Sequence, residues 1–142
     1  MRLKLDQNAL ALSSRLERIA GVQVKDSFMD EEEETIYFIV APGELGKAIG
    51  KGGMNIKRLS EELGKRIRIT EYRDNVLEFV RGFIYPAAVA EVVQEGSDIL
   101  IRDESRKTKS LLIGRGGKNI KLLNRAVKRF FSINEVKVLD LH

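Results

Sequence analysis

The sequence of 142 residues predicts an α+β fold made of two similar modules in tandem, each in the order helix, strand, strand, helix, helix, strand. The first observation behind this prediction is a repeat, because IGKGGMNIK at residues 49–57 recurs as IGRGGKNIK at residues 113–121, an offset of 64 residues. The second is the hydrophobic spacing around each copy, which changes between strand and helix periods in the same order twice. Modules of about 65 residues are marginal alone. We therefore expect domains at residues 1–73 and 74–142 that pack rigidly, with almost no linker.

The first module is predicted from hydrophobic spacing and stop signals. Leu12, Leu16 and Ile19 fall on one helix face, and Gly21 ends that helix. The acidic run at residues 30–34 predicts a solvated hairpin tip, which we expect to lie away from any nucleic-acid surface. The predicted elements are a helix at residues 6–20, strands at 22–27 and 35–41, a helix at 44–49, the glycine turn, a helix ending near Gly64 and a strand at 66–72.

The second module repeats this order. Asn75 and Ser105 are suited to cap its first two helices, and Pro86 ends the first of them. Ile120, Leu123, Val127 and Phe130 form one face of its last helix. The predicted elements are a helix from Asn75 to Pro86, strands at residues 87–94 and 98–102, a helix at 105–113, the glycine turn, a helix through Phe130 and a strand at 133–141.

Composition excludes several classes of function. Hydrophobic residues make up 43% of the chain, which suffices for a globular core. Without cysteine there are no disulfides, thiolate metal sites or thiol nucleophiles, and the only histidine is the terminal His142. No carboxylates have catalytic or metal-ligand spacing, so we expect a non-enzymatic protein without metal or cofactor. The lack of cysteine and of any apolar run of about 20 residues favours a cytoplasmic protein with no membrane partner.

Positive charge is concentrated around the second glycine turn. Residues 105–130 include nine basic residues and no acidic one, whereas the other 16 basic residues are outnumbered by 21 acidic residues elsewhere. The nine are Arg106, Lys107, Lys109, Arg115, Lys118, Lys121, Arg125, Lys128 and Arg129. Most basic runs are simply solvated helix faces. Here the cluster coincides with a glycine turn, which favours a polyanion-binding surface.

Each glycine turn has the chemistry of a phosphate site. Glycine adopts positive φ and lets the backbone approach a ligand without a Cβ in the way. The next helix offers N–H groups and a partial positive charge at its N-terminus. Lys51 or Arg115 adds a full charge. Such a site suits a phosphodiester that is held through backbone and shape and not through base identity.

Two nucleotide-binding motifs fit poorly. A P-loop has four residues between its first glycine and Gly-Lys, followed by Ser or Thr, but Gly46 and Gly50 are separated by three residues and Gly52 replaces the hydroxyl. The second copy has Ser110 in place of Gly46. A dinucleotide fingerprint requires a strand directly before the turn, and both turns follow predicted helices.

Both segments, IGKGGMNI at residues 49–56 and IGRGGKNI at residues 113–120, closely resemble the GXXG loop of KH domains, which clamps about four nucleotides of single-stranded backbone. The element order resembles the type II, prokaryotic KH topology. One GXXG is weak evidence, whereas two copies with the same flanking Ile, Asn and Ile are strong evidence. The alternative is a tandem structural repeat whose turns are only packing corners.

Tandem type II modules, with VAPGELGKAIG at residues 40–50 before the first loop, resemble the KH pair of the NusA family of transcription factors over nearly the whole chain. The resemblance implies binding of nascent single-stranded RNA during elongation, termination or antitermination. Bacterial members have an additional polymerase-binding domain and an OB-type domain, for which this chain has no room, so it is closer to the short archaeal NusA-like form. The resemblance alone implies RNA polymerase as a partner. The polymerase-binding role of the additional bacterial domain is not carried over to this chain.

The predicted RNA site combines the two loops, neighbouring cations and flanking side chains. Ile49, Ile56, Ile113 and Ile120 can hold bases against aliphatic surface, although the core is the favoured position for each one taken singly. Asn55 and Asn119 are also suited to brace their helices instead of touching RNA. The predicted RNA-binding residues are Gly50, Lys51, Gly52, Gly53, Gly114, Arg115, Gly116, Gly117, Lys47, Ile49, Asn55, Lys57, Arg58, Ile113, Lys118, Asn119 and Lys121.

Two other functions compete with transcription. One is RNA binding in ribosome assembly, and the other is a KH-fold protein-interaction scaffold that binds no nucleic acid. A scaffold gives no reason for nine basic residues without an acid around the second loop. Because that loop lies within the basic stretch, we predict that residues 114–117 contribute more electrostatic affinity than residues 50–53.

Overall fold

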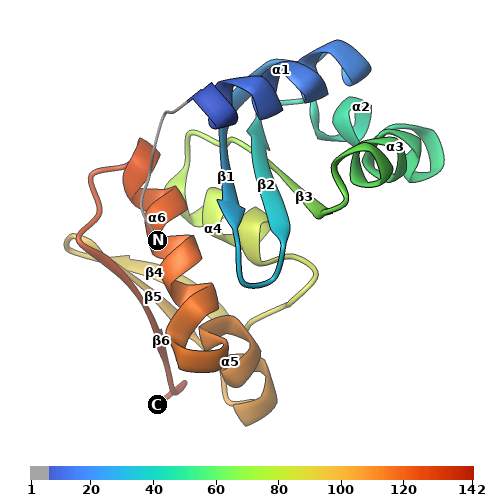
Figure 1. The fold of residues 1–142 in the computed structure, drawn as a ribbon. Helices are drawn as coiled ribbons and strands as arrows, with labels where there is room; N and C mark the ends of the chain where they lie inside the picture. The colour runs from blue at the N-terminus through green and yellow to red at the C-terminus, as the bar shows by residue number, and fades with distance from the viewer. Residues whose placement is uncertain (1–6) are drawn as a thin grey trace. The chain divides into compact units, whose positions relative to one another are not determined.

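The computed structural model describes residues 7–142, with side chains described from residue 10 onward. The chain splits into two compact units, Met1–Tyr72 and Arg73–His142, and each is described here by itself. Helices and strands are both present in each unit, which confirms the predicted α+β class (Figure 1). No helix among the described residues has the length and apolar character to cross a membrane.

The first unit is a three-stranded sheet with helices around it. Its strands lie in the order β1-β2-β3, with β1 antiparallel to β2 and β3 parallel to β2. Its elements are α1 (Gln7–Ala20), β1 (Val24–Asp30), β2 (Thr35–Val40), α2 (Leu45–Ile49), a 3-10 turn (Lys51–Gly53), α3 (Met54–Leu63) and β3 (Arg66–Glu71).

The second unit has the same element order and sheet pattern. Its strands lie in the order β4-β5-β6, with β4 antiparallel and β6 parallel to the central β5. Its elements are α4 (Val76–Ile84), β4 (Glu91–Glu95), β5 (Asp98–Arg102), α5 (Arg106–Ile113), a 3-10 turn (Arg115–Gly117), α6 (Lys118–Phe130) and β6 (Glu135–Leu139).

The parallel pairing determines where each glycine turn lies. Parallel neighbours require a crossover connection, and in both units the crossover consists of helix, glycine turn and helix. In the first unit it leaves the C-terminal end of β2 at Val40 and returns to β3 at Arg66, which pairs with Thr35. The glycine turn is therefore held by two helices that are anchored to the same sheet.

The core of the first unit lies between its helices and one face of β2. Ile36, Phe38 and Val40, which alternate along β2, are buried with Leu16 of α1 and Leu59 of α3. Leu12 and Ile19 pack against this cluster, as the predicted face of the first helix requires. Burial of such side chains contributes about 1.5–3 kcal/mol each.

The core of the second unit is richer in aromatic residues. Phe79 of α4 is fully buried, and its ring centroid lies 6.1 Å from that of Phe130 and 5.6 Å from that of Phe131. Leu123 and Val127 of α6 are also buried, whereas Phe130 is half-buried at the end of the predicted face. The α6 helix is thereby fixed against α4.

Predicted helix caps are present where the sequence indicated them. The Asn75 side chain accepts hydrogen bonds from the backbone N–H groups of Leu77 and Glu78, at 2.9 and 3.1 Å. Ser105 Oγ accepts one from Thr108 at 3.1 Å. These bonds satisfy first-turn donors that the helix itself leaves unpaired.

Three predicted strands had boundaries that were wrong by up to four residues. β1 runs from Val24 to Asp30 and not over residues 22–27, and the N–H of Gln23 donates to Glu44 Oε1 at 2.8 Å and so is not available to a strand. β4 begins at Glu91, not at residue 87, because the N–H of Ala90 donates to Asp103 Oδ1 at 2.8 Å. β6 is also shorter than the predicted strand at 133–141.

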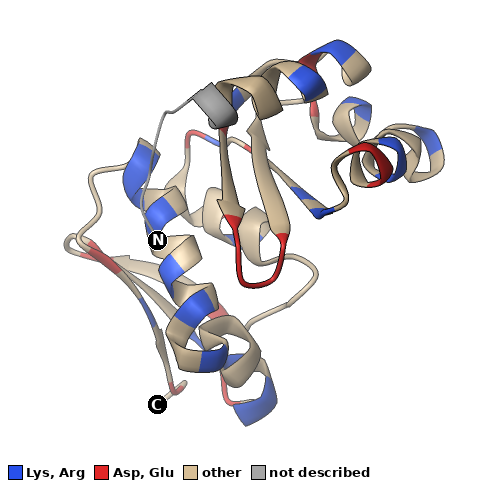
Figure 2. Ribbon diagram, in the orientation of Figure 1, with Lys and Arg blue, Asp and Glu red and all other residues tan. Residues whose placement is uncertain are grey.

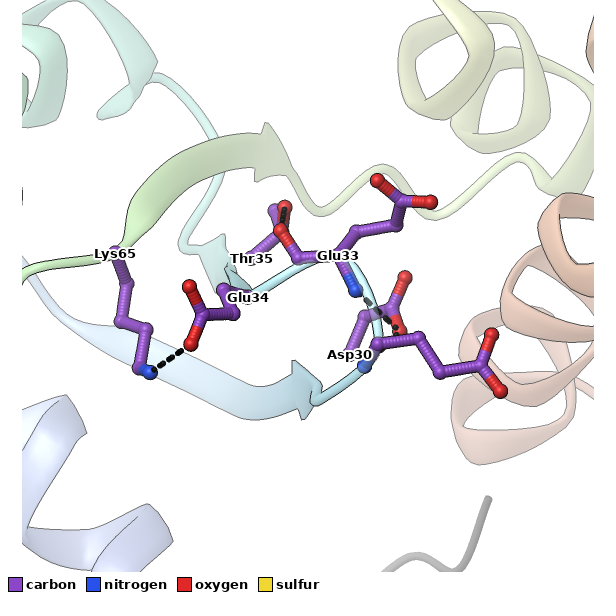
Figure 3. A network of polar contacts seen from close by, with 6 residues as sticks. Asp30, Glu33, Glu34, Thr35 and Lys65 are labelled. Atoms are coloured by element: carbon purple, nitrogen blue, oxygen red, sulfur yellow. Dashed lines mark hydrogen bonds and ion pairs between the residues drawn. The ribbon is translucent and has the colours of Figure 1, made fainter.

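The acidic run between β1 and β2 differs from the expected solvated tip at its first residue. Asp30 belongs to β1 and is only 3% exposed, and its Oδ1 accepts the N–H groups of Glu32 and Glu33 at 3.2 and 3.4 Å (Figure 3). Lys65 Nζ lies 3.1 Å from Glu34 Oε1. The other four residues of the run are exposed, and Asp30 acts as the internal support of their turn.

This acidic turn lies at the opposite end of β2 from the connection to the first glycine turn. It precedes Thr35, whereas α2 follows after Val40 (Figure 1). Six residues of strand span about 20 Å. The four exposed glutamates are thus separated from the start of the crossover by the length of the strand.

Candidate nucleic-acid interface

The two glycine turns have nearly the same backbone conformation. Gly50 has φ 82° and ψ 163°, and Gly114 has φ 77° and ψ 170°. The third position is equally close, with φ 65° and ψ 21° at Gly52 and φ 65° and ψ 18° at Gly116. Units whose remaining sequences differ therefore build the same loop.

The first glycine of each loop is required by both conformation and space. Its φ and ψ values lie in a region that is essentially restricted to glycine. A Cβ on Gly50 would lie 2.8 Å from Asn55 Nδ2 and 3.0 Å from its backbone nitrogen. On Gly114 it would lie 2.7 Å from Asn119 Cγ and 2.8 Å from its backbone nitrogen. No other residue fits here without moving the start of the next helix.

The middle glycines have a different role. A Cβ on Gly52, Gly53 or Gly116 would meet nothing within 4 Å, and on Gly117 only side-chain carbons at 3.9 Å. Gly52 and Gly116 are exposed. These positions keep the outer surface of each loop open, so a ligand can approach the backbone closely.

Asn55 and Asn119 brace the loops through side-chain hydrogen bonds. Asn55 Nδ2 donates to the Lys47 carbonyl at 3.1 Å, and Asn119 Nδ2 donates to the Leu111 carbonyl at 2.8 Å. Each bond satisfies a carbonyl near the end of the short helix and ties it to the next helix. The bracing role considered for these residues is thus present at both positions.

The helices that follow the loops begin without side-chain caps. Gly53 precedes α3 and Gly117 precedes α6, and neither helix start has a side-chain hydrogen bond or an acidic residue in its first turn. The helices α4 and α5, by contrast, are capped by Asn75 and Ser105. An uncapped N-terminus beside an open glycine loop offers N–H groups and a partial positive charge to an anion.

The predicted cations surround the loops to different degrees. Lys51 and Arg115 are exposed at the second position of each loop. Lys57 and Arg58 are exposed on α3, where Arg58 Nε lies 3.4 Å from Glu62 Oε1. Lys118 is half-buried at the start of α6.

Two lysines differ in where their stems lie. Lys47 reaches toward the end of α1: its Nζ lies 3.7 Å from the place that a Cβ on Gly21 would take. Lys121 turns back toward the second loop: its Cε lies 3.9 Å from the place that a Cβ on Gly117 would take. The second loop thus has a lysine stem over it, whereas nothing lies within 4 Å of the equivalent position on Gly53.

The isoleucines beside the loops are not core residues, and the core position favoured for each one taken singly was wrong. Ile49, Ile56 and Ile120 are half-buried, and Ile113 is 38% exposed. The core positions of these segments are filled by their neighbours, which include Ala48, Leu59, Leu112 and Leu123. The isoleucines therefore leave aliphatic surface beside each loop.

Sequence reasoning missed two exposed aliphatic side chains on the helices that flank the loops. Met54 is 62% exposed at the first residue of α3, and Leu111 is 61% exposed on α5. Aligning the repeat reveals that their counterparts are Lys118 and Lys47. The first loop thus has its cation before the turn (Lys47) and its apolar residue after it (Met54). The second loop has the apolar residue before the turn (Leu111) and the cation after it (Lys118).

Acidic residues from outside the basic stretch approach it in the folded unit. Lys109 donates to Asp140 Oδ1, and this hydrogen bond and charge, with a weaker effect of Arg106, hold the pKa of Asp140 below its usual value. Glu135 lies near the cations of α6. The cluster is acid-free in sequence but not in space, although blue segments still recur along α6 (Figure 2).

Known proteins resemble this chain over most of its length. Residues 11–75 match the family model described as the NusA-like second KH domain. The probable transcription termination protein NusA of Methanococcus vannielii is 31% identical over 98% of this chain and 81% of its own length. That of Methanocaldococcus jannaschii is 33% identical over 87% of this chain and 68% of its own length.

A solved structure has the same fold. The crystal structure of APE1850 covers 95% of this chain and is itself covered completely, with 30% identity and a TM-score of 0.74. The family model describes a second KH domain, yet it matches the first unit of this chain. A KH-like α+β domain is thus present in the first unit.

Proposed function

Because the chain belongs to the NusA family, we propose that it binds single-stranded RNA and acts in transcription elongation, termination or antitermination. In this proposal both units are type II KH domains, at residues 1–73 and 74–142, which pack rigidly as a tandem pair. Their loops at residues 50–53 and 114–117 clamp the RNA backbone.

The observation that carries the proposal is the pair of equivalent open loops, each followed by a helix without a side-chain cap. Two other helices of the chain are capped by their own side chains. The N–H groups of Met54 and Lys118 donate to the carbonyls of Lys51 and Arg115 within the 3-10 turns. The first-turn N–H groups that these turns do not use are the ones offered to phosphate oxygens. Exposed Lys51 and Arg115 add charge-assisted contacts beside them.

The other predicted RNA-binding residues take secondary roles in this model. Ile49 and Ile113, with exposed Met54 and Leu111, offer aliphatic surface to bases, and Lys121 extends the charge of the second loop. Lys47, Lys57, Arg58 and Lys118 contribute general positive potential. Asn55 and Asn119 act by fixing loop shape, because their amide groups already donate to backbone carbonyls.

Transcription is favoured over ribosome assembly because the matching archaeal proteins are described as probable transcription termination proteins. Co-purification distinguishes the two functions. A tagged chain should associate with RNA polymerase in a nucleic-acid-dependent manner. Association with ribosomal subunits alone would favour the assembly role.

Fluorescence anisotropy with single-stranded RNA tests the clamp. The loop variants Lys51→Asp/Gly52→Asp and Arg115→Asp/Gly116→Asp add negative charge where the space around Gly52 and Gly116 is open. Disabling one loop should weaken binding of an RNA that spans both loops by about 100-fold, because the avidity of the pair is lost.

The matched control is Gly96→Asp/Arg81→Asp, outside both loops and outside the basic stretch. Gly96 also has positive φ and open space, and Arg81 is exposed on α4. The control should bind RNA within a few-fold of wild type, with far-UV circular dichroism verifying that all variants fold. If the combined four-residue loop variant binds as tightly as the control, the clamp model is wrong.

A further inference from the structure

A shallow hollow of about 360 Å³ lies beside α6 in the second unit, outside the glycine loop. Lys121, Asn124, Arg125 and Lys128 line it from α6, and Glu135 lines it from β6. Three of the five lining residues are basic and one is acidic. The hollow therefore has the charge of a site for an anion.

The wall of the hollow is held in place by Asn124. Its Nδ2 donates to the carbonyls of Ile120 and Val136 at 3.0 Å each, and its Oδ1 accepts the Val136 N–H at 2.7 Å. The two bonds to Val136 join α6 directly to β6. Both N–H groups of the amide are used in these bonds, so the cationic side chains remain the donors that can contact an anion.

The cations form a line along one side of α6. Lys121, Arg125 and Lys128 are four and three residues apart, which places them on one face of a helix. Arg125 has bonding partners of its own within the protein, so the argument rests on the two lysines. Both lysines are exposed, and among the described residues neither forms an ion pair.

This line begins at the glycine loop. The stem of Lys121 lies over Gly117, and Lys128 follows two helical turns later, about 10.5 Å along the axis. Blue segments recur along the length of this helix (Figure 2). An extended polyanion that leaves the loop toward α6 would meet positive charge continuously.

We propose that the hollow binds a second stretch of RNA phosphodiester backbone, continuous with the stretch that the loop at residues 114–117 holds. The inference rests on the proposed function and adds a direction to it, since the strand runs along α6 toward Lys128. Charge complementarity supports this occupant. Glu135 on the opposite wall repels phosphate from β6 and keeps the strand against the lysines.

The test compares Lys128→Gln with the matched control Arg81→Gln. Both remove one exposed cation from the second unit, but Arg81 lies on α4, outside the basic stretch and outside the hollow. Both changes are made in the full chain carrying Lys51→Asp/Gly52→Asp, so that the first loop does not contribute. Anisotropy is measured with RNAs of about 5 and about 12 nucleotides, because one KH loop holds about four.

Lys128→Gln should weaken binding of the longer RNA by about fivefold and reduce the slope of log K against log salt by about 0.7, the value for one lost phosphate contact on a single strand. It should leave binding of the shorter RNA unchanged. Arg81→Gln should change binding of neither length by more than about 1.5-fold, since salt screens an exposed charge that lies outside the site.

Equal effects of Lys128→Gln and Arg81→Gln at both lengths would overturn the inference while leaving the loop clamp intact. If the chain with unaltered loops binds no RNA, both the inference and the proposed function are wrong. If Lys128→Gln instead weakens only the binding of a glutamate oligomer of matched charge, the hollow accepts an acidic protein segment and not RNA.

Discussion

Replacing Gly114 with alanine should destabilise the second unit by about 3–5 kcal/mol, far more than the same change at Gly116. Alanine at φ 77° and ψ 170° pays a backbone strain of about 1–3 kcal/mol. Its Cβ would lie 2.8 Å from the backbone nitrogen of Asn119, which cannot rotate away. Relieving that contact costs a further 1–3 kcal/mol, as overpacking usually does.

The Asn119 brace adds to this cost. The new Cβ would lie 2.7 Å from Asn119 Cγ, so the side chain must move and lose its hydrogen bond to the Leu111 carbonyl. A hydrogen bond of this kind contributes about 0.5–1.5 kcal/mol. Gly116→Ala meets nothing within 4 Å and keeps a left-handed conformation, so it should cost only about 1 kcal/mol.

Urea denaturation followed by far-UV circular dichroism measures both values. A double-mutant cycle with Asn119→Ala separates the two contributions, because that change removes the side-chain contact and leaves the backbone contact. Gly114→Ala should then cost less in the Asn119→Ala background by about 1 kcal/mol. Equal destabilisation by Gly114→Ala and Gly116→Ala would refute the steric reasoning.

Three further outcomes are expected. Asn124→Ala should lower the free energy of unfolding by about 2–3 kcal/mol in the same denaturation assay, because two hydrogen bonds between α6 and β6 and one within α6 are lost; a cost below about 0.5 kcal/mol would contradict this. By NMR titration the pKa of Asp140 should lie below 3.8 and should rise toward that value in Lys109→Met. Because the pKa is lowered in the folded state, the contribution of Asp140 to stability is complete above pH 3.8 and is lost as the pH falls through its folded-state pKa. In RNA titrations Arg115→Gln should reduce the salt slope more than Lys51→Gln, because Arg115 lies within the basic stretch at residues 105–130, and the reverse order would contradict this.

The order of elements was predictable because local signals determine it. Asn75 and Ser105 were recognised as caps from the sequence, and both form the expected hydrogen bonds. The strand boundaries were less accessible, because a side chain distant in sequence decides them. Ala90 leaves the ladder through a bond to Asp103, which alternation of apolar residues cannot reveal.

The glycine loops were predictable from the repeat, whereas the surroundings were not. The sequence placed Lys47 and Lys121 together as loop cations, but only the second has its stem over a loop. The exposed Leu111 had a sequence signal, since three consecutive apolar residues cannot all face one side of a helix, and Leu112 takes the buried place. The approach of Asp140 to Lys109 depends on tertiary structure alone.

The parallel pairing of β2 with β3 gives the first loop mechanical strength. A force on the loop is transmitted to β2 at Val40 and to β3 at Arg66, which lie at opposite ends of a register of six paired residues. The force is therefore distributed over all the hydrogen bonds between the two strands, and these bonds do not break one after another. The second unit has the same arrangement over five pairs. A loop mounted in this way can hold a strand under tension without unravelling the sheet that supports it.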